Sequence, residues 1–349
     1  MAEGEAMSSV PRTIEWRDGA IMLLDQTLLP IEVKSIEITS VDVLVEAIQR
    51  LAVRGAPALG VAGALGVALA MDQAIRESWS SDQLNEAIDQ IRNARPTAVN
   101  LAWAVDKVRP LLPEGRDVVF AAAEKIAAED EAANHAMGKL GADWWLAKVG
   151  DRPLRLLTHC NTGSLATTAW GTALGVIREL ATRGRIEIVF ADETRPLLQG
   201  ARLTAWELDQ EGIPYKVLPD GAAAMAIMTG EIDGALIGAD RIVSNGDSAN
   251  KIGSLGVALA CNAAGIPFMV VAPESTVDRS MKSGKEIHIE FRNDAEVCNF
   301  AGVRTTPIGA TSYNPAFDVT PARFIAAVVT EKRVYEIAQG EDLNSGSAS

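Results

Sequence analysis

The hydrophobic pattern of the first 150 residues changes from strand-like to helical near residue 40. Apolar residues flank the turn dipeptide Asp18-Gly19, which predicts a hairpin over Thr13–Leu24 followed by a third strand over Ile31–Ile38. From Ser40 onward, apolar residues recur with helical spacing. Further helices are predicted to begin near three polar residues, Ser81, Asn100 and Arg116, and to continue to Lys148. Residues 10–150 are therefore predicted to form a smaller domain of a short antiparallel sheet plus helices.

After Gly150, short apolar runs alternate with helical stretches. The runs that predict strands are Leu154–His159, Ile186–Ala191, Tyr215–Leu218, Gly234–Gly238 and Pro267–Ala272. The stretches that predict helices are Leu165–Thr182, Ala201–Glu211, Ala222–Thr229 and Gly253–Ala264. Strands that are apolar along their whole length are typical of a parallel sheet with helices on both faces. Residues 151–340 are therefore predicted to form an α/β domain with a doubly wound parallel sheet, whose ligands bind beyond the carboxyl ends of the strands.

The composition is that of a globular protein with an acidic surface. The 349 residues carry 32 Lys and Arg against 46 Asp and Glu, a formal net charge of −14. This charge disfavours nucleic-acid and anionic-membrane partners, but not a small anionic substrate in a local basic pocket. The three cysteines, Cys160, Cys261 and Cys298, are far apart, so neither a disulfide framework nor a zinc site is predicted. A reducing, cytoplasmic location is expected.

No stretch of the sequence is predicted to cross a membrane. The most apolar stretch, Ala56–Met71, contains Pro57 and three glycines and is shorter than the roughly 18 residues that a span requires. Met1–Ser9 is acidic and polar, without the basic start and apolar core of a signal peptide. We expect Met1–Ser9 and Glu341–Ser349 to be loose tails.

The first predicted strand of the second domain leads into Cys160, followed by a glycine-containing turn and a helix predicted to begin at about Ser164. A thiol beside a helix N-terminus feels the positive end of the helix dipole, which favours the thiolate that acts as a base or nucleophile. A buried structural cysteine is the alternative, but the strand–turn–helix position favours the reactive one. His159 is expected to point to the opposite face, so we interpret it as structural and not as a partner of Cys160.

Carboxylates follow two of the predicted strands. A carboxyl group at the end of an apolar strand is poorly solvated, which raises its pKa toward the range of a general acid. Asp240 either points into the ligand cleft or pairs with Arg241, and because strand neighbours face opposite ways the cleft is favoured. Asp192 and Glu193 are adjacent, so they are not expected to converge on one bond.

Three further polar residues lie near the predicted starts of helices. Gln199 either hydrogen-bonds a ligand hydroxyl or makes a cap or loop contact. Asn250 and Lys251 are predicted to lie at a helix N-terminus, where backbone N–H groups favour an anion and these side chains add donors for a phosphate. A solvated surface lysine is the alternative for Lys251.

Two arginines of the first domain lie at predicted tight turns, Arg54 before Gly55-Ala56-Pro57 and Arg95 before Pro96. A guanidinium presents a fixed fork of donors that suits a phosphate or hydroxyl, although each arginine taken alone is more typical of a surface residue. The chain lacks GxGxxG at the first strand–helix turn and lacks GxxxxGK[ST], so no dinucleotide or nucleoside triphosphate site is predicted. It also lacks a Ser/His/Asp pattern and a metal-binding cluster, so no metal and no cofactor are expected.

Six sequence blocks, taken together, resemble a known family. They are Arg54–Gly60 (RGAPALG), Arg95–Leu101 (RPTAVNL), Thr158–Ala166 (THCNTGSLA), Ala191–Trp206 (ADETRPLLQGARLTAW), Gly238–Lys251 (GADRIVSNGDSANK) and Asn314–Pro321 (NPAFDVTP). The match runs from about Trp16 to Glu331 and identifies the chain as similar to the methylthioribose-1-phosphate isomerase family. That family resembles the regulatory subunits of the eukaryotic translation-initiation guanine-nucleotide exchange factor and ribose-1,5-bisphosphate isomerase.

The resemblance implies a cytoplasmic isomerase of methionine salvage that converts 5-methylthio-D-ribose 1-phosphate to 5-methylthio-D-ribulose 1-phosphate. It implies a Rossmann-like domain behind a smaller N-terminal domain, a homodimer, a small sugar-phosphate ligand, and no cofactor, nucleic acid or membrane. Family roles carried onto matching residues make Asp240 the proton donor and Cys160 its catalytic partner. The implied substrate-binding residues are Arg54, Gly55, Ala56, Arg95, Gln199, Asn250 and Lys251.

The chemistry of this reaction accounts for these residue types. The phosphate on the anomeric oxygen leaves no free hemiacetal, so an acid such as a protonated Asp240 must protonate the ring oxygen as the ring C1–O bond breaks. Hydrogen then moves from C2 to C1 as a ketone forms at C2, and a Cys160 thiolate is a candidate base. Transfer as a proton through an enolate and transfer as a hydride both stay open. An apolar lining from the N-terminal domain would suit the methylthio group and exclude water.

Two alternative functions stay open at this point. One is an isomerase of another pentose 1-phosphate, such as ribose 1,5-bisphosphate or 5-deoxyribose 1-phosphate, although Asn161–Ser164 resembles the methylthio-sugar enzymes. The other is a non-catalytic sugar-phosphate or nucleotide-sensing regulatory subunit. Such a sensor needs neither a thiolate nor a poised acid, so the presence of Cys160 and Asp240 disfavours it.

Overall fold

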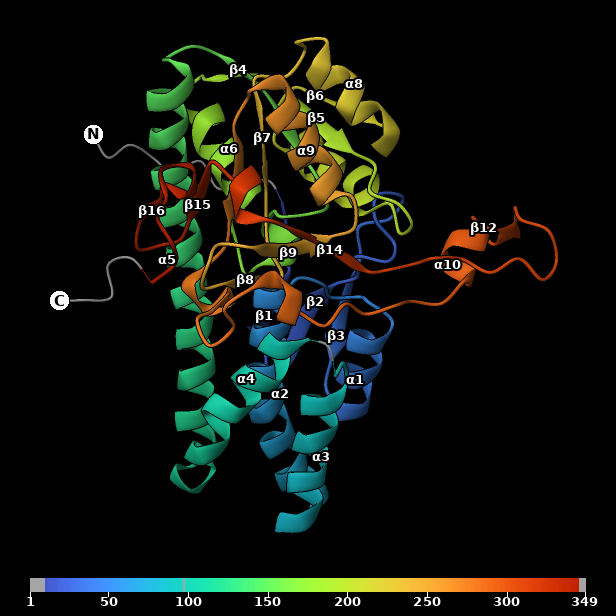
Figure 1. Ribbon diagram of the computed structural model, residues 1–349. Coiled ribbons are helices and arrows are strands. Elements are labelled where there is room, and N and C mark those ends of the chain that lie inside the picture. The colour runs from blue at the N-terminus through green and yellow to red at the C-terminus, as the bar shows by residue number, and fades with distance from the viewer. Residues whose placement is uncertain (1–9, 97, 345–349) are drawn as a thin grey trace. The chain divides into compact units, whose positions relative to one another are not determined.

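The computed structural model describes residues 10–96 and 98–344, and the chain divides into two compact units (Figure 1). Unit 1 comprises the described residues up to His135 together with Thr162–Gly171 and Gln210–Gly212. Unit 2 comprises Ala136–Asn161, Thr172–Asp209 and the described residues from Ile213 onward. The predicted N-terminal tail, residues 1–9, and the last five residues of the predicted C-terminal tail lie outside the described residues.

Unit 1 contains the predicted antiparallel sheet, in the order β1-β2-β3. Its strands are β1 (Ile14–Arg17), β2 (Ala20–Leu24) and β3 (Ser35–Ile38). The hairpin prediction is confirmed: Asp18 and Gly19 both have positive φ, 52° and 84°, as a tight two-residue turn requires. The third strand begins later than predicted, because Ile31 and Val33 are exposed and gain no burial from a strand there.

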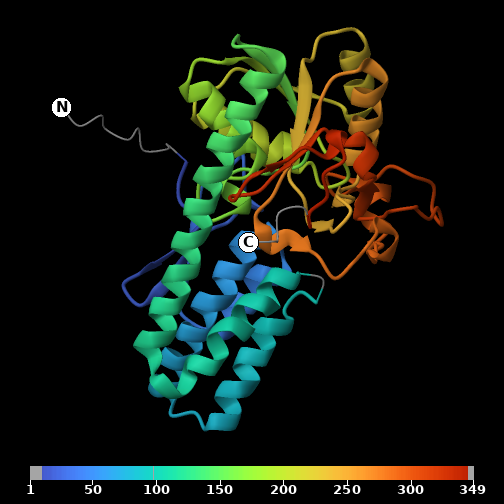
Figure 2. The same cartoon turned by 60° about the vertical axis from the view of Figure 1, so that its left-hand side comes forward.

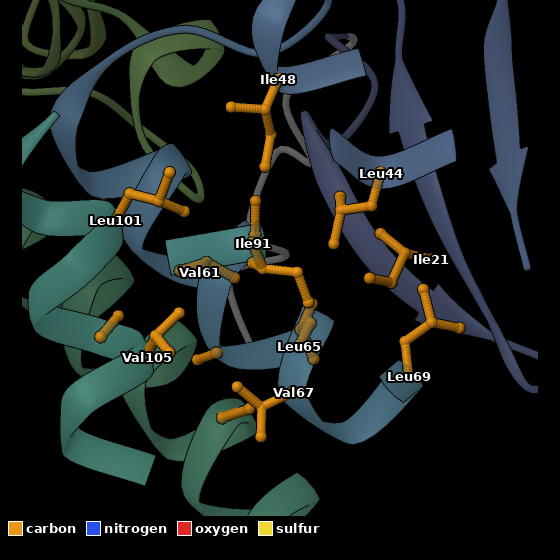
Figure 3. Close-up of a cluster of buried hydrophobic side chains, with 14 of the residues drawn as sticks. Ile21, Leu44, Ile48, Val61, Leu65, Val67, Leu69, Ile91, Leu101 and Val105 are labelled. Atoms are coloured by element: carbon orange, nitrogen blue, oxygen red, sulfur yellow. The ribbon is translucent and has the colours of Figure 1, made fainter. Parts of the chain in front are cut away.

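The helices of unit 1 pack around one apolar helix, α2 (Figure 3). They are α1 (Val41–Gln49), α2 (Ala56–Glu77), α3 (Ser81–Asn93), α4 (Val99–Val108) and the first part of α5 (Arg116–Val149). Fourteen residues of α2 are buried, from Ala58 to Gln73. Its glycines lie where neighbouring helices come close: Gly60 and Gly63 face α4, and Gly66 faces Leu44 and Ile91. The predicted helix starts near residues 81, 100 and 116 are confirmed to within one residue.

Helix α2 corrects the prediction that no stretch is long enough to span a membrane. The apolar stretch continues to Glu77 as one helix of 22 residues, because the small residues allow close packing without breaking the helix. By length and composition this helix could cross a membrane, yet 78% of its most apolar 18-residue window is buried inside the structure. Its partners in the core of unit 1 account for its apolar character.

We expect Gly63→Val to lower the free energy of unfolding by about 1–3 kcal/mol through overpacking. A Cβ at Gly63 would lie 2.9 Å from Leu101 Cδ1 and 3.0 Å from the Leu101 carbonyl oxygen. The matched control is Gly256→Val in α9, where a Cβ meets no atom of the described residues within 4 Å. The control is expected to change stability by less than about 0.5 kcal/mol. Urea denaturation measures both, and equal losses would contradict the close packing of α2 on α4.

Unit 2 is built on a seven-stranded sheet in the order β16-β15-β10-β7-β4-β5-β6. Its strands are β4 (Leu154–Thr158), β5 (Ile186–Asp192), β6 (Tyr215–Leu218), β7 (Gly234–Ile237), β10 (Phe268–Val271), β15 (Ala327–Val329) and β16 (Val334–Tyr335). All pair in parallel except β16, which is antiparallel to β15. Numbered along the chain, the parallel strands have the order 3-2-1-4-5-6, so the Rossmann-like doubly wound prediction is confirmed. The strand order reverses between β4 and β7, which is where such sheets bind ligands.

Both faces of the large sheet are buried, because alternate strand residues enter different hydrophobic cores. Leu156 and Leu236 pack with residues of α5, α6 and α7, whereas Leu157 and Ile237 pack with residues of α8 and α9. The covering helices are α6 (Ala173–Thr182), α7 (Ala205–Gln210), α8 (Ala223–Met228) and α9 (Ser254–Ala264). The predicted alternation of apolar strands and helices is therefore confirmed for this unit.

A second, four-stranded sheet in unit 2 was not predicted. It has the order β11-β8-β9-β14, with β8 (Arg241–Val243), β9 (Ser248–Lys251), β11 (Val277–Asp278) and β14 (Phe317–Thr320). Its strands are two to four residues long, and β9 reads Ser-Ala-Asn-Lys, so no apolar run indicated it. A short helix, α10 (Ala295–Cys298), and a hairpin of β12 (Asn299–Phe300) and β13 (Val303–Arg304) extend away from the large sheet (Figure 1).

Helix α5 belongs to both units and is continuous in both views (Figures 1 and 2). The sequence placed a domain boundary at residue 150, where this helix ends. Unit 2 nevertheless begins at Ala136, because the second half of α5 contributes Trp144 and Trp145 to a core of the large sheet. Trp145 packs against Gly234 of β7, where a Cβ would lie 2.4 Å from the indole.

The ionised carboxylate of Asp233 stabilises unit 2, and this stabilisation is lost at acid pH. Burial of Asp233 alone would raise its pKa, but hydrogen bonds from Arg152 and Arg155 outweigh burial and lower the pKa to about 2. Because this pKa is below its ordinary value, the stabilisation is present above about pH 4 and is lost as the pH falls through about 2. We expect wild type to exceed Asp233→Asn in free energy of unfolding by on the order of 1–2 kcal/mol at pH 7. Urea denaturation should show this difference shrinking between pH 4 and pH 2, and a constant difference would contradict the assignment.

Candidate active site

The predicted site residues fall into two groups, one in each unit. Unit 2 holds Cys160, Gln199, Asp240, Asn250 and Lys251, all near the carboxyl ends of strands of its two sheets. Unit 1 holds Arg54, Gly55, Ala56 and Arg95.

Cys160 lies two residues beyond the end of β4, on a turn with a strained backbone. Its φ is 67°, in the left-handed region that a non-glycine residue rarely adopts. Two side-chain hydroxyls hold this conformation: the Cys160 N–H donates to Thr194 Oγ1 at 2.9 Å, and Thr204 Oγ1 donates to the Cys160 carbonyl at 2.7 Å. Backbone strain that the surroundings enforce is typical of functional sites.

The expectation of a helix N-terminus beside Cys160 is wrong. Ser164–Ala166 forms only a short 3₁₀ turn, and α6 begins at Ala173. The apolar and small residues from Leu165 onward suggested a continuous helix, but Trp170 and Gly171 adopt positive φ, which interrupts it. The helix dipole therefore does not account for the reactivity that was predicted for the thiol.

Gln199 is the side chain that lies against the Cys160 thiol. Its Nε2 is 3.5 Å from the Cys160 Sγ, and the residue is 1% exposed. Its Oε1 is buried and has no hydrogen-bond partner among the described residues. A buried acceptor without a donor is costly, by about 1–3 kcal/mol, so a ligand hydroxyl beside the thiol would stabilise this arrangement. A ligand contact of Gln199 stays a prediction, which its buried Oε1 beside the thiol supports.

A small pocket, partly open to solvent, adjoins Gln199. Its lining residues are Pro196, Leu197, Gln199, Lys251, Arg292, Glu296, Asn314 and Ala316. Lys251 Nζ donates to the Ala316 carbonyl at 2.9 Å and lies 4.3 Å from the centre of the Phe317 ring. Lys251 is only 7% exposed, which contradicts the alternative of a solvated surface lysine. A partly buried ammonium beside a pocket is a suitable partner for an anion.

The sequence did not single out Arg292, Glu296 or Asn314 as pocket residues. Arg292 pairs with Glu296 at 2.6 Å, and Asn314 Nδ2 donates weakly to the Glu296 carboxylate at 3.4 Å. Asn314 opens one of the six sequence blocks, which was an available signal. Arg292 has no local motif, and only the fold brings it to Lys251.

Asn250 and Lys251 are strand residues, which corrects their predicted place at a helix N-terminus. Both belong to β9, paired with β14, and α9 begins three residues after Lys251 at Ser254. The sequence did not indicate this strand, because it is short and polar and follows a run of residues typical of a loop. Asn250 is buried and donates from Nδ2 to Ser254 Oγ at 3.0 Å, so its amide supports the turn that leads into α9.

Asp240 follows β7, on the other side of the strand-order reversal from Cys160. Its N–H donates to the Ala249 carbonyl at 2.9 Å, which fixes its backbone beside β9. Arg241 pairs with Asp278 at 3.3 Å, which accounts for the arginine next to it. Asp240 is exposed, so the poorly solvated environment expected for its carboxyl group is not present. The strand ends at Ile237, and the three residues beyond it carry Asp240 out of the apolar sheet.

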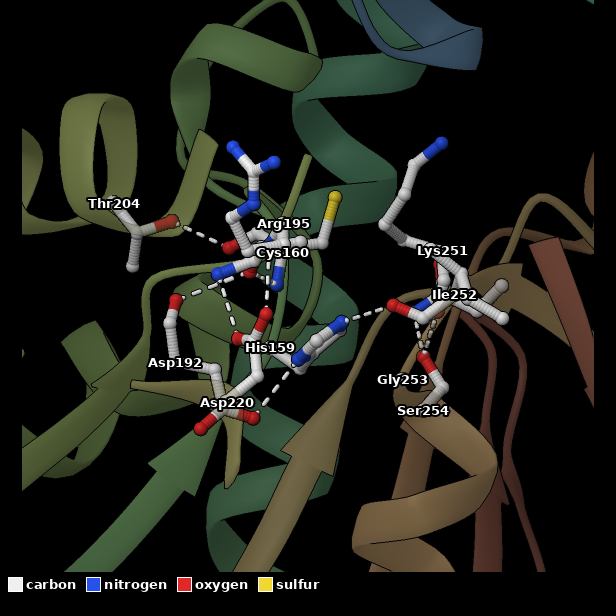
Figure 4. Close-up of polar contacts among 12 residues, drawn as sticks. His159, Cys160, Asp192, Arg195, Thr204, Asp220, Lys251, Ile252, Gly253 and Ser254 are labelled. Carbon is white, nitrogen blue, oxygen red and sulfur yellow. Dashed lines mark hydrogen bonds and ion pairs between the residues drawn. The ribbon is translucent and has the colours of Figure 1, made fainter. Parts of the chain in front are cut away.

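His159 forms a buried pair with Asp192 at the end of β5. Its Nδ1 is 2.8 Å from Asp192 Oδ2 and its Nε2 is 2.8 Å from the Ile252 carbonyl oxygen, while both side chains are 1% exposed (Figure 4). Asp220 completes a group of three residues whose ligand atoms lie within 4.8 Å of one another. Because both ring nitrogens of His159 already contact oxygen atoms of the protein, neither is available as a metal ligand.

In unit 1, the Arg54–Ala56 turn packs against the segment that follows Cys160 in the chain. Gly55 has a φ of 87°, and a Cβ there would lie 2.0 Å from the Ala166 carbonyl oxygen, so only glycine fits. Ala56 is the first residue of α2, and Arg54 is half-buried. Arg95 is half-buried in the turn between α3 and α4, while Thr97 of that sequence block lies outside the described residues.

Comparison with known proteins identifies close relatives along nearly the whole chain. Residues 52–336 match the initiation factor 2 subunit family. A methylthioribose-1-phosphate isomerase from Xanthomonas campestris is 49% identical over 93% of this chain and 92% of its own length. A Nocardia farcinica protein named probable bifunctional methylthioribose-1-phosphate isomerase/methylthioribulose-1-phosphate dehydratase is 52% identical over 92% of this chain, which spans 58% of that relative's length. A Moorella thermoacetica protein named 5-deoxyribose 1-phosphate isomerase is 46% identical over 92% of this chain and 93% of its own.

Two solved structures have the same fold. The 5-methylthioribose 1-phosphate isomerase of Pyrococcus horikoshii superposes with a TM-score of 0.86 at 40% identity, covering 94% of this chain and 93% of its own. The translation initiation factor eIF-2B subunit delta of A. fulgidus superposes with a TM-score of 0.83 at 39% identity, covering 93% and 96%. Their similarity confirms the predicted fold.

We expect Thr194→Val to lower the free energy of unfolding by about 1–3 kcal/mol, because the Cys160 N–H loses its acceptor. Valine keeps the β-branched shape at a position whose φ is 62°. Thr194→Ser is the matched control: it keeps the hydroxyl and is expected to cost less than about 1 kcal/mol. Urea denaturation compares the three proteins. A serine variant as unstable as the valine variant would show that the hydroxyl is not the group that matters.

Proposed function

The chain belongs to the initiation factor 2 subunit family, and we propose that it converts 5-methylthio-D-ribose 1-phosphate to 5-methylthio-D-ribulose 1-phosphate, a step of methionine salvage. The observation that carries the proposal is the near full-length similarity to proteins named methylthioribose-1-phosphate isomerase. The reaction is an aldose–ketose isomerisation.

The arrangement of unit 2 supports this chemistry. Cys160 and Asp240 follow the two central strands, β4 and β7, between which the strand order reverses. We propose that Asp240 protonates the sugar ring oxygen as the ring C1–O bond breaks. Cys160 then serves as the base as hydrogen moves from C2 to C1 and the ketone forms at C2. Gln199, which contacts the thiol and carries an acceptor in need of a donor, is proposed to bind a sugar hydroxyl.

The phosphate is proposed to bind basic and amide groups. Lys251 supplies a poorly exposed positive charge at the pocket, and Asn250 precedes it in β9. The turn residues Arg54, Gly55 and Ala56 and the half-buried Arg95 are proposed to supply further donors, as their match to the family blocks suggests. A guanidinium fork and an ammonium together suit a dianion.

We further propose that the enzyme works in the cytoplasm, as a homodimer, and without a metal or organic cofactor. The three cysteines are all free thiols, which suits a reducing compartment. The proposed acid and base suffice for the hydrogen transfer, so the reaction requires no redox partner.

5-Deoxyribose 1-phosphate is a second candidate substrate, because one relative is named 5-deoxyribose 1-phosphate isomerase. The two sugars differ only in the substituent on C5, which takes no part in the isomerisation. We propose methylthioribose 1-phosphate as the preferred substrate, since most of the relatives described above carry that name.

The decisive experiment follows methylthioribose 1-phosphate by proton NMR with wild type, Cys160→Ser and Asp240→Asn. We expect wild type to form the ketose, and each variant to lose at least about 100-fold in kcat, as removal of a general acid or base does. The kcat/KM values for the methylthio and 5-deoxy sugars then rank the two substrates.

The matched controls are Cys298→Ser and Asp233→Asn, which lie outside the proposed site and are expected to retain wild-type kcat. An inactive wild type, or full activity in both site variants, would overturn the proposal. An inactive wild type that still binds the sugar phosphate in calorimetry would favour the regulatory, non-catalytic alternative.

A further inference from the structure

We propose that His159 is a positioning residue of the reaction, whose ring ties the peptide after Lys251 to the strand ends that carry Cys160. The inference rests on the proposed function, because Lys251 and Cys160 are the groups that it aligns. It assigns His159 a role beyond the structural one indicated by the sequence.

The ring of His159 bridges two segments that are far apart in the sequence. Its Nδ1 contacts Asp192 Oδ2 at the end of β5, and its Nε2 contacts the carbonyl oxygen of Ile252, each at 2.8 Å. In Figure 4 the ring lies between these two oxygens. The Cys160 thiol and the Lys251 ammonium point toward the same side of the strand ends in this view. The bridge therefore lies beneath two groups that are proposed to act on one substrate.

The contacts of the ring define where its protons must be. A carbonyl oxygen only accepts hydrogen bonds, so Nε2 must carry a proton to bond Ile252. Nδ1 then either donates to an ionised Asp192 or accepts a proton from a neutral one. In both cases the bond to Ile252 is kept. A ring protonated on Nδ1 alone would set two lone pairs against each other and break the bridge.

The surroundings raise the pKa of both members of the buried pair, that of Asp192 chiefly because burial disfavours its charged form. Burial lowers the pKa of His159, but the hydrogen bond and negative charge of Asp192 outweigh it and raise the pKa above its usual value. Asp220, in the loop after β6, adds to this effect, and Asp318 of β14 also interacts with the ring. Asp318 receives the Gly253 and Leu255 N–H groups, which fixes the start of α9 beside the ring.

Ile252 is held from two directions. Its N–H donates to the Ala316 carbonyl at 3.1 Å, while its own carbonyl receives His159. Lys251 Nζ bonds the same Ala316 carbonyl at 2.9 Å. Without His159, the peptide after Lys251 would lose its bond to the end of β5 and keep its bonds to the Ala316 carbonyl and the Ser254 hydroxyl. The position of the ammonium relative to the large sheet would then no longer be fixed at this point.

The other end of the bridge is the turn that holds Cys160. Thr194 Oγ1 accepts from the Cys160 N–H and donates to the Asp192 carbonyl at 3.0 Å. Asp192 thus fixes His159 with its side chain and, through Thr194, fixes Cys160 with its backbone. Asp192 and Thr194 therefore hold both the ring of His159 and the backbone of the next residue, Cys160.

Gly253 shows how closely the ring is enclosed. Its φ is 108°, and a Cβ there would lie 2.6 Å from His159 Cε1 and 2.9 Å from Nε2. No side chain fits between the ring and this turn. Because the ring lies so close to Gly253, its Nε2 can reach the carbonyl oxygen of Ile252, the residue before it.

The first test reads the protons of the ring directly. The protein is labelled with ¹⁵N-histidine, and its three histidines give a simple long-range ¹H–¹⁵N spectrum, in which His159→Gln assigns the missing signal. We expect Nε2 of His159 to stay protonated as the pH rises past the usual histidine pKa of about 6.5. A ring protonated only on Nδ1 would overturn the bridge in the wild-type protein, without the need for any variant to fold.

The second test separates positioning from stability by kinetics on methylthioribose 1-phosphate. We expect His159→Phe to lower kcat/KM by about 10–100-fold, with a rise in KM because Lys251 is displaced and a fall in kcat because Cys160 shifts. Asp192→Asn is expected to keep KM within about threefold, since the new amide donates to Nδ1 and the Nε2 bond to Ile252 is retained. His159→Gln keeps an amide donor and should recover part of the loss.

Exposed His288 supplies the matched control, since His288→Gln makes the same change away from the site and should leave KM and kcat unaltered. Wild-type KM and kcat in both folded His159 variants would overturn the inference. If the phenylalanine variant fails to fold, His159→Gln and the spectrum decide the question. A wild-type protein inactive on the sugar phosphates contradicts the proposed function, whereas an active enzyme whose His159 variants match it contradicts the positioning role alone.

Discussion

The end of strand β5 is the constraint on which the site depends. Asp192 receives His159 with its carboxylate and the Thr194 hydroxyl with its carbonyl. Gly200 lies so close that a Cβ there would be 1.7 Å from the same carbonyl oxygen. These polar groups are buried, where a lost partner is not replaced by water. The turn that presents Cys160 therefore cannot move without breaking bonds at this strand end, and close packing at Gly200 holds the turn of Gln199 against it.

Much of the fold of unit 2 could be predicted, because strands such as Leu154–Thr158 and Gly234–Ile237 consist mostly of apolar residues. Such a composition indicates a strand that is buried on both faces of the sheet. The second sheet could not, since a strand such as Ser248–Lys251 is held by pairing with β14 and by little apolar burial of its own. The position of Cys160 after a strand was predicted correctly, but its environment was not. Its strained turn depends on Thr194 and Thr204, which lie more than 30 residues away in the sequence.

The net charge of −14 and the basic character of the pocket are compatible because they act over different distances. Charges on the surface are screened within about 8–10 Å at physiological salt. Lys251 is nearly buried and Arg292 lines the same pocket, so both would act on the proposed phosphate with little intervening water. Glu296 pairs with Arg292 and tempers this local positive charge. An acidic protein can therefore select an anion without attracting polyanions to its surface.

The apolar helix α2 has a consequence for the chain while it is being synthesised. The ribosome releases residues 56–77 before residues 99–108, which form α4 and cover α2 in the folded unit. During that interval the nascent chain exposes a segment apolar enough to attract membranes or other unfolded chains. The glycines that later admit α4 also weaken the isolated helix, by about 1 kcal/mol each relative to alanine. The residues that make close packing possible thus also lower the stability of this apolar helix before its partners have been made.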